Sequence, residues 1–214
     1  MVEWSIEALR GAASIGGIFV AAPAGAEHEH EFTGEDLFVV AGGEMRADSV
    51  GNGLDRVETE LVAIHDAARP LITAELVEEV IAALVADPGA DGAIAAAPVS
   101  DTIKRANRAR SGDGPAEGSR GALGADRAHD APLAVEGTVD RAELWAAQTP
   151  QVFRVEALRR ALDADPGAAA AATDEAMLVE AAGGRVLIHP SPPVNIKVTT
   201  PLDLRVAELL LAER

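Results

Sequence analysis

The stretch that decides the fold is LVAIHDAARP, residues 61–70. Its first four residues form a short apolar run, which predicts a buried strand, and Asp66 and Arg69 follow where that strand ends. In open α/β sheets, ligands bind just beyond the carboxyl ends of the strands. An acid and a guanidinium at such an end suit a metal–phosphate substrate, with Asp66 as a ligand of Mg²⁺. Arg69 could instead form a simple salt bridge with Asp66 across the turn.

Strands and helices alternate along most of the chain, which indicates an α/β fold with a largely parallel, doubly wound sheet. The final helix has a clear start, with Thr200 as N-cap, Pro201 at its first position and Asp203 at its third. The expected strands lie at residues 18–22, 37–40, 61–64, 92–99 and 186–188, and the expected helices at 5–13, 46–61, 73–85, 154–162, 173–182 and from about 200.

The amino-acid composition argues against several classes of function. The 214 residues suffice for one substantial domain or two small ones, and 48% of them are hydrophobic. The absence of cysteine excludes disulfides and thiolate chemistry. No apolar run approaches the ~20 residues that span a bilayer, and no signal peptide is visible, so we expect a soluble cytoplasmic protein. A net charge of −17 argues against nucleic-acid and membrane partners, but not against an anionic small molecule.

Two segments are expected to lie outside the regular sheet. Residues 106–133 are rich in Gly, Ala, Arg and Asp without a hydrophobic period, which predicts a flexible excursion. The flanking stretches 102–105 and 135–139 could pair as an antiparallel arm. His28 and His30 alternate with glutamates in a polar loop, where a solvated loop is favoured over a metal site.

Four further blocks place polar residues at expected strand ends. GGEMRADSV (42–50) follows a strand and opens a helix, so its amides could hold an anion or a nucleobase edge, or form an ordinary turn. Ser100 to Lys104 could be only a polar strand end. Gln148, Thr149 and Gln151 suit substrate hydroxyls or a structural turn. Lys197 precedes the last helix against the helix-dipole preference, which favours a functional role.

Taken in order, these blocks resemble the 2-C-methyl-D-erythritol 4-phosphate cytidylyltransferase family of the non-mevalonate isoprenoid pathway. The order, spacing and composition agree over nearly the whole chain. The matching stretches are GGEMRADSVGNGL, VAIHDAARPLI, APVSDTIKR, GTVDRAELWAAQTPQVFR, TDEAMLVEAAG and NIKVTTPLDLRVAE.

The resemblance implies a Rossmann-like nucleotidyltransferase sheet in a single domain over residues 1–214. A protruding β-arm with a flexible insertion is expected at about 100–143. It also implies transfer of CMP from CTP to methylerythritol 4-phosphate, giving CDP-methylerythritol and pyrophosphate with Mg²⁺ as cofactor. The family further implies a homodimer with shared active sites.

The resemblance assigns roles residue by residue. By position, Gly43, Glu44 and Ser49 match residues near the cytosine, although the family often has Asp where Glu44 stands. Asp66 matches a residue at the active centre that contacts the sugar phosphate and lies close to the metal. Arg141 and Lys197 match the grip on the phosphate. The residues expected to line the methylerythritol phosphate site are Arg69, Thr102, Arg141, Thr149, Thr173 and Lys197, of which Thr102, Arg141 and Thr149 are expected on an arm that reaches the partner subunit.

The sequence departs from the family at its start. The family begins with a strand and a Gly-rich loop that wraps the triphosphate, whereas this chain opens at the helix that follows them. A start codon assigned at an internal Met is the simplest explanation. The missing strand would lie inside the sheet, so two edges are expected to stay unpaired or to pair with each other. Without the loop, we expect little or no cytidylyltransferase activity from the chain as written.

Two other functions stay open. A cytidylyltransferase for another polyol phosphate, such as ribitol 5-phosphate, would share many of these blocks, but Arg141, Thr149 and Thr173 together favour methylerythritol phosphate. A non-catalytic dimeric binding or scaffold protein is supported only by the missing loop. The chemically competent residues retained in every substrate block argue against it.

Overall fold

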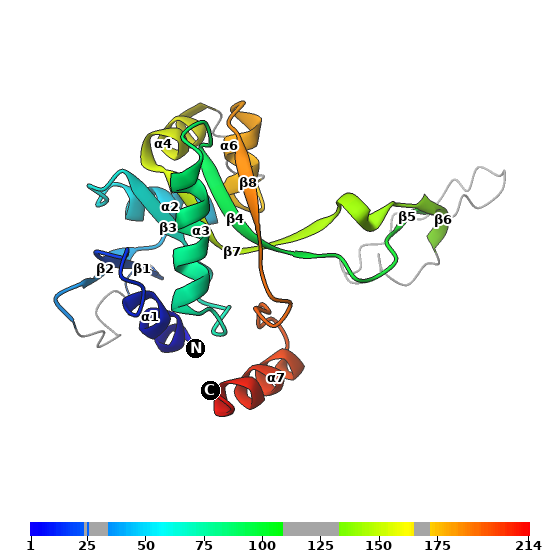
Figure 1. Cartoon of the computed structure of the whole chain (residues 1–214), viewed down its shortest axis with the longest axis horizontal. Coiled ribbons are helices and arrows are strands. Elements are labelled where there is room, and N and C mark those ends of the chain that lie inside the picture. The colour runs from blue at the N-terminus through cyan, green and yellow to red at the C-terminus, as the bar shows by residue number, and fades with distance from the viewer. Residues whose placement is uncertain (24, 26–33, 109–132, 165–171) are drawn as a thin grey trace, which may run out of the picture. The chain divides into compact units, whose positions relative to one another are not determined.

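The computed structural model describes residues 1–23, 25, 34–108, 133–164 and 172–214. The described chain divides into two compact units, one formed by Met1–Ala97 with Ala146–Arg214 and the other by Pro98–Trp145 (Figure 1). His28, His30 and most of the expected excursion lie outside the described residues. No helix in the described ranges is long and apolar enough to cross a membrane.

The first unit is built on two separate sheets. The larger has the strand order β3 (Leu61–Ile64), β7 (Trp145–Arg154), β4 (Gly92–Pro98), β8 (Val186–Pro190). In it β4 and β8 run parallel, whereas β3 and β7 run antiparallel. The smaller sheet pairs β1 (Ile18–Ala22) with β2 (Leu37–Ala41), also in parallel. Strands that alternate with helices and include two parallel pairs confirm the α/β class.

Six α-helices surround these sheets in the described chain: α1 (Val2–Arg10), α2 (Arg46–Leu54), α3 (Ala74–Ala86), α4 (Val155–Ala164), α6 (Glu175–Ala181) and α7 (Pro201–Ala212). Neighbouring residues of β4 and β7 bury on opposite faces, as the two-residue period of a strand requires. Ile94 and Phe153 join a core with α2, α4 and α6. Ala93 and Val152 join a second core with α3.

Most of the expected elements are present, with two errors in helix bounds and one omission. The helix expected over 5–13 begins and ends three residues earlier, as α1. The helix expected over 46–61 was wrong at its end, because α2 stops at Leu54. Gly51 and Gly53 weaken its last turn. Strand β7 was not predicted as a strand, since Gln148, Pro150 and Gln151 interrupt its apolar pattern.

The expected start of the last helix is confirmed by its capping contacts. The Thr200 hydroxyl accepts from the Asp203 amide at 3.2 Å, and the Asp203 carboxylate accepts from the Thr200 amide at 2.8 Å. This reciprocal pair satisfies two amides that a helix start leaves free.

A gap in hydrogen bonding separates the two sheets. Within the part of the chain that the structure describes, β1 and β3 do not pair with each other, and each keeps one edge without a neighbouring strand. Residues 18–21 of β1 and 61–67 at β3 line the same cavity, whose volume is about 1370 Å³. Strands β1 and β3 therefore each present an unpaired edge to this cavity.

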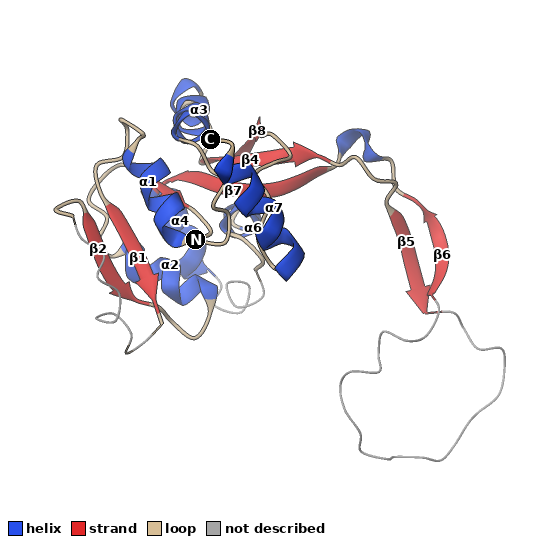
Figure 2. Ribbon diagram, turned by 90° about the horizontal axis from the view of Figure 1, so that it is seen from below, coloured by secondary structure: helices blue, strands red, loops and turns tan. Residues whose placement is uncertain are grey.

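The second unit contains the expected antiparallel pair. Strand β5 (Lys104–Arg108) pairs with β6 (Leu133–Thr138), with an irregularity between Arg105 and Ala106 (Figure 2). A short 3₁₀ turn, η2 (Arg141–Glu143), follows, and its Asp140 cap accepts from the Ala142 amide at 3.0 Å. Strand β5 ends at Arg108 and β6 begins at Leu133, so both extend into the stretch 106–133 that was expected to be irregular.

Candidate active site

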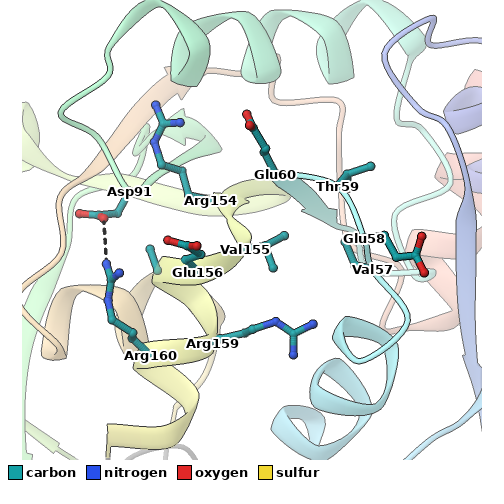
Figure 3. A pocket seen from close by; sticks show the side chains of 11 residues that line it. Val57, Glu58, Thr59, Glu60, Asp91, Arg154, Val155, Glu156, Arg159 and Arg160 are labelled. Carbon is teal, nitrogen blue, oxygen red and sulfur yellow. Dashed lines mark ion pairs between the residues drawn. The ribbon is translucent and has the colours of Figure 1, made fainter.

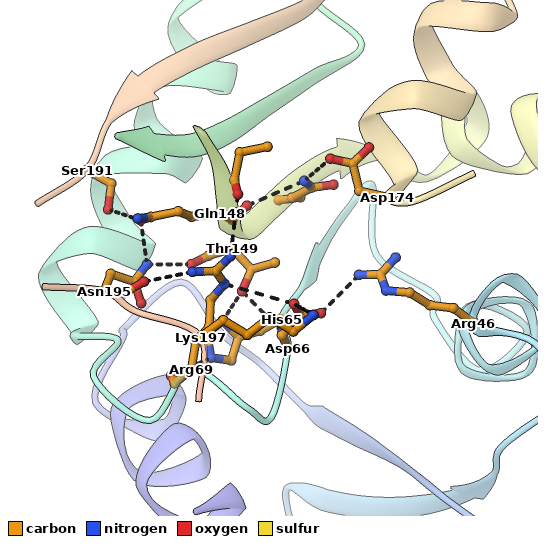
Figure 4. A network of polar contacts seen from close by, with 12 residues as sticks. Arg46, His65, Asp66, Arg69, Gln148, Thr149, Asp174, Ser191, Asn195 and Lys197 are labelled. Carbon is orange, nitrogen blue, oxygen red and sulfur yellow. Dashed lines mark hydrogen bonds and ion pairs between the residues drawn. The ribbon is translucent and has the colours of Figure 1, made fainter. Parts of the chain in front are cut away.

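The turn after β3 brings Asp66 to the end of its strand, as the sequence predicts. The Arg69 amide donates to the Asp66 carbonyl at 2.9 Å and closes the turn. From β7, the Thr149 hydroxyl accepts from the Asp66 amide at 3.1 Å. Because β3 and β7 are neighbours in the sheet, this contact fixes the backbone of Asp66 against the central strand (Figure 4).

His65 completes this turn as a neutral side chain. Its Nδ1 lies 2.8 Å from the Thr149 hydroxyl, and its Nε2 lies 3.2 Å from the Arg69 carbonyl. Burial lowers the pKa of His65 to about 4, against the hydrogen bond with the Arg69 carbonyl, which raises it. A neutral ring that donates from Nε2 and accepts at Nδ1 satisfies both contacts, so the Thr149 proton points to His65.

Three cationic side chains surround the Asp66 carboxylate. Lys197 Nζ lies 2.9 Å from Oδ2, and Arg46 Nη2 lies 3.2 Å from Oδ1. Burial would raise the pKa of Asp66, but the hydrogen bond and charge of Lys197, with the charge of Arg46, outweigh it and lower that pKa. Asp66 is therefore an anion in a strongly cationic setting.

Arg69 is more than a simple partner of Asp66. Its Nε stays 3.9 Å from the Asp66 carboxylate, whereas its Nη1 donates to the Asn195 carbonyl at 2.8 Å and its Nη2 to the Ala147 carbonyl at 3.4 Å. The Val198 amide also donates to the Ala68 carbonyl at 2.7 Å. Together these bonds hold the Lys197 segment against the turn after β3.

The amides of β7 serve the structure. Gln148 Oε1 accepts from the Ser191 hydroxyl at 2.9 Å and from Asn195 Nδ2 at 3.1 Å. Gln151 Nε2 donates to Asp174 at 3.0 Å, and its Oε1 accepts from the Ala176 amide at 3.3 Å. The two amides therefore have structural partners, but they lie within strand β7 and not in the turn that was the structural alternative. Asn195, which sequence reasoning did not single out, has only its proximity to Lys197 as a sequence signal.

An ion pair joins the partly exposed Arg46 to the buried Glu175, and the sequence analysis predicted a role for neither. Arg46 begins α2, and its Nη1 contacts Oε1 of Glu175 at the start of α6. Burial raises the pKa of Glu175, and the hydrogen bond and charge of Arg46 act against that rise. Both residues lie inside stretches that match the family, and this match is the sequence signal that could have identified them.

The loop expected near a nucleobase is a tight turn. The Gly43 amide donates to the Ser49 hydroxyl at 3.0 Å, and that hydroxyl also lies 3.3 Å from the Met45 carbonyl. A side chain at position 43 would collide with Asp48, which accounts for the glycine. Glu44 is exposed beside it. The contacts fit an ordinary β–α turn, and the cytosine roles of Gly43, Glu44 and Ser49 stay predictions.

The other expected site residues lie in two places. Thr173 is exposed directly before α6, whose cap Asp174 accepts from the Met177 amide at 3.0 Å. Thr102 and Arg141 belong to the second unit, where Arg141 donates to the Ser100 carbonyl. The first unit thus brings together Asp66, Arg69, Thr149 and Lys197. The expectation that Thr149 lies on the arm was therefore wrong, and the substrate roles of all the expected site residues stay predictions.

Two hollows lie on the first unit. Arg46, Ser49, His65 and Asp66 line the cavity between β1 and β3, so the polar cluster borders that cavity. A second hollow of about 570 Å³ lies between α4 and the loop before β3 (Figure 3). Its lining mixes acids with Arg154, Arg159 and Arg160, and it includes none of the expected site residues. The candidate site is therefore at the first cavity.

The comparisons with known proteins agree with the quoted blocks. The family model described as IspD, 2-C-methyl-D-erythritol 4-phosphate cytidylyltransferase, matches residues 1–113 and 125–213. The protein of that name from Rubrobacter xylanophilus is 43% identical over 175 residues, covering 80% of this chain and 64% of the relative. A bifunctional enzyme IspD/IspF from Anaeromyxobacter dehalogenans is 40% identical over 202 residues, covering 92% and 46% respectively. The chain thus spans between about half and two thirds of these curated relatives.

A solved structure extends the likeness to the fold. The 2-C-methyl-D-erythritol 4-phosphate cytidylyltransferase of Thermus thermophilus superposes with a TM-score of 0.74 at 29% sequence identity. The match covers 99% of this chain and 88% of that one. The arrangement of elements around the Asp66 cluster is thus shared with a structure of that description.

Proposed function

Because the chain belongs to the 2-C-methyl-D-erythritol 4-phosphate cytidylyltransferase family, we propose that it is built to transfer CMP from CTP to methylerythritol 4-phosphate. The products are CDP-methylerythritol and pyrophosphate. The observation that carries the proposal is the Asp66 cluster, where Lys197, Arg46 and Arg69 gather around one carboxylate at a strand end. Such transfers depend on positioning two anions and neutralising charge in the transition state.

The residues have distinct tasks in this proposal. Lys197 is half exposed, with 47% of its side chain accessible, so its ammonium can turn from Asp66 to a substrate phosphate. Arg69 is more buried and braces the turn. Arg141 supplies a second phosphate contact, and Thr102, Thr149 and Thr173 line the sugar site. Gly43, Glu44 and Ser49 face the cytosine.

Mg²⁺ is part of the proposal through Asp66. The described residues contain no cluster of three or more metal-ligating side chains. A single carboxylate nevertheless fits a magnesium that takes its other ligands from phosphates and water, which is its usual state in nucleotide sites. When bound there, the ion would neutralise charge on the triphosphate. Asp66 would hold it, and Lys197 would keep its own contact with the phosphate.

The proposed assembly is a homodimer with shared active sites, as the family resemblance implies, and its proposed location is the cytoplasm. In it, Thr102 and Arg141 of each subunit serve the partner's site. We further propose that the chain as written is impaired. Among the described residues that line the cavity beside Asp66, the basic side chains are those of Arg46 and Arg56. Arg46 is already paired with two carboxylates, so this wall is poorly equipped to hold a triphosphate.

Pyrophosphate release from CTP, methylerythritol 4-phosphate and Mg²⁺ tests both parts. We expect the chain as written to be slow, and a version extended by the family's first strand and Gly-rich loop to be faster by about 10²–10³ for each restored donor. Lys197→Met and Asp66→Asn should abolish the gain. Equal rates for the short and extended chains would disprove the impairment.

Two further measurements distinguish the alternative functions. Ribitol 5-phosphate in place of methylerythritol 4-phosphate distinguishes the substrates, and methylerythritol 4-phosphate should be preferred. An extended chain that binds neither CTP nor the sugar phosphate in calorimetry would instead be a scaffold.

A further inference from the structure

We propose that Glu175 is a positioning residue for the active site: it holds Arg46, and Arg46 in turn orients the Asp66 carboxylate. The inference concerns the sugar-phosphate site and so rests on the proposed function. Neither residue was assigned a role from the sequence. The pair spans 129 positions of the chain and ties the start of α6 to the start of α2.

The first argument is the burial of Glu175. Only 2% of its side chain is exposed, and its Oε2 has no hydrogen-bond partner in the described chain. An ionised carboxylate in such a place is stable only beside a cation, because burial removes its water. Arg46 is that cation, so it cannot leave without stranding a buried charge. Glu175 therefore fixes where the guanidinium lies.

The second argument is the shape of the guanidinium. Arg46 directs Nη1 to Glu175 and Nη2 to Oδ1 of Asp66, the latter at 3.2 Å. The planar group holds its two Nη atoms at a fixed angle, so anchoring one of them aims the other. A lysine at this position would carry the same charge but could not hold two carboxylates in one plane.

The third argument is that the two oxygens of Asp66 are held separately. Oδ1 faces Arg46 from α2, whereas Oδ2 lies 2.9 Å from Lys197, just before α7. Restraint from both sides fixes the rotation of the carboxylate. If Arg46 loosens, Asp66 can turn toward Lys197, which takes the ammonium away from an incoming phosphate. Glu175 also lies two residues after Thr173, so the same ion pair steadies a second expected contact of the sugar phosphate.

The test uses the chain as it exists, with four variants: E175Q, R46K, R46Q and the double variant E175Q/R46Q. The first readout needs no substrate. It is the side-chain carboxyl ¹³C resonance of Asp66, identified by its loss in D66N. E175Q and R46K should both shift it, and E175Q should add no further shift once R46Q is present. E79Q is the matched control, because Glu79 is an exposed glutamate paired with His189.

The second readout is the affinity for methylerythritol 4-phosphate, measured by calorimetry beside the melting temperature of each variant. We expect E175Q and R46K to bind about tenfold more weakly, the loss typical of one misplaced charge-assisted hydrogen bond. R46K keeps the charge beside Glu175, so it tests the geometry even if E175Q does not fold. E79Q should bind like the unchanged chain.

The outcomes separate the two proposals. An unmoved Asp66 resonance in E175Q and R46K, or losses of affinity that simply add in the double variant, would overturn the positioning role. No binding of the sugar phosphate by the unchanged chain would count against the proposed function, while the resonance would still decide the role of Glu175.

Discussion

Thr149 shows how few side chains connect the strands at the site. Its hydroxyl accepts from the Asp66 amide and points its proton at His65. The ring of His65 in turn donates a hydrogen bond from Nε2 to the Arg69 carbonyl. The turn that carries both Asp66 and Arg69 is thus braced from β7 through one hydroxyl and one neutral imidazole. This arrangement makes the site sensitive to acid.

We expect the free energy of unfolding to fall as the pH drops from 7 to 5. The unfolded chain binds a proton at His65 below its ordinary pKa of 6.5, whereas the folded chain resists until about 4. The unfolded state therefore binds more protons in this window, and acid favours it. The loss should be about 2 kcal/mol, measured by urea unfolding at both pH values.

The variant His65→Gln should flatten this dependence, and His189→Gln on β8 should retain it. An unchanged slope in His65→Gln would show that another group causes the loss of stability.

The sequence predicted the residues that lie at strand ends and missed those that act across the fold. Asp66 and Arg69 directly follow an apolar run, so the pattern alone placed them at a strand end, whereas Thr149 and Lys197 were assigned to the same site through the family resemblance. Arg46 and Glu175 meet across 129 positions. In the local sequence, each is simply a charged residue in the first turn of a helix. No local pattern indicates that the Glu175 side chain is buried.

At the scale of elements, two glycines differ in whether the surrounding structure leaves room for a side chain. A methyl group on Gly92 at the start of β4 would collide with the fully buried ring of Phe153. A methyl group on Gly53 within α2 would meet nothing within 4 Å. The first glycine is required by packing, whereas the second only weakens its helix.

We therefore expect Gly92→Ala to destabilise the fold by about 1–3 kcal/mol, since the ring cannot move in a filled core. Gly53→Ala should stabilise it by about 0.5–1 kcal/mol through helix propensity. Denaturant unfolding of both variants checks the pair, which serves as its own control. Losses of equal size at the two positions would contradict the packing argument.

The same scale explains the errors about elements. Strand β7 was missed because its central part, Gln148–Gln151, looks like a polar turn with a proline. The hydrogen-bond partners of those amides come from the segments around Asp174 and Asn195, which only the fold brings near. The helix expected over 46–61 was too long because Gly51 and Gly53 weaken the helical pattern before it ends.

For the whole molecule, the division of the sheet predicts two levels of stability. Helix α1 and strands β1 and β2 share a small core of Ile6, Ile18 and Leu37. Strands β4 and β7 contribute to two larger cores on opposite faces. Without hydrogen bonds from β1 to β3, the small sheet can open before the large one does.

Native-state hydrogen exchange measures this difference directly. Amides of β1 and β2 should open with a free energy lower by roughly 2 kcal/mol or more than amides of β4. An N-terminal extension that supplies a strand between β1 and β3 should remove the difference. A single opening free energy throughout the chain as written would show that the two sheets unfold together.

The open edges of β1 and β3 also bear on how copies of this chain meet one another. Unpaired strands are templates on which other chains can add, and they promote aggregation unless something keeps copies apart. Here the net charge of −17 provides long-range repulsion. Salt at about 1 M shortens the reach of that repulsion to roughly 3 Å and leaves the edges unchanged. Concentrated salt, which many purification steps use, is thus a condition that makes this chain more prone to precipitate.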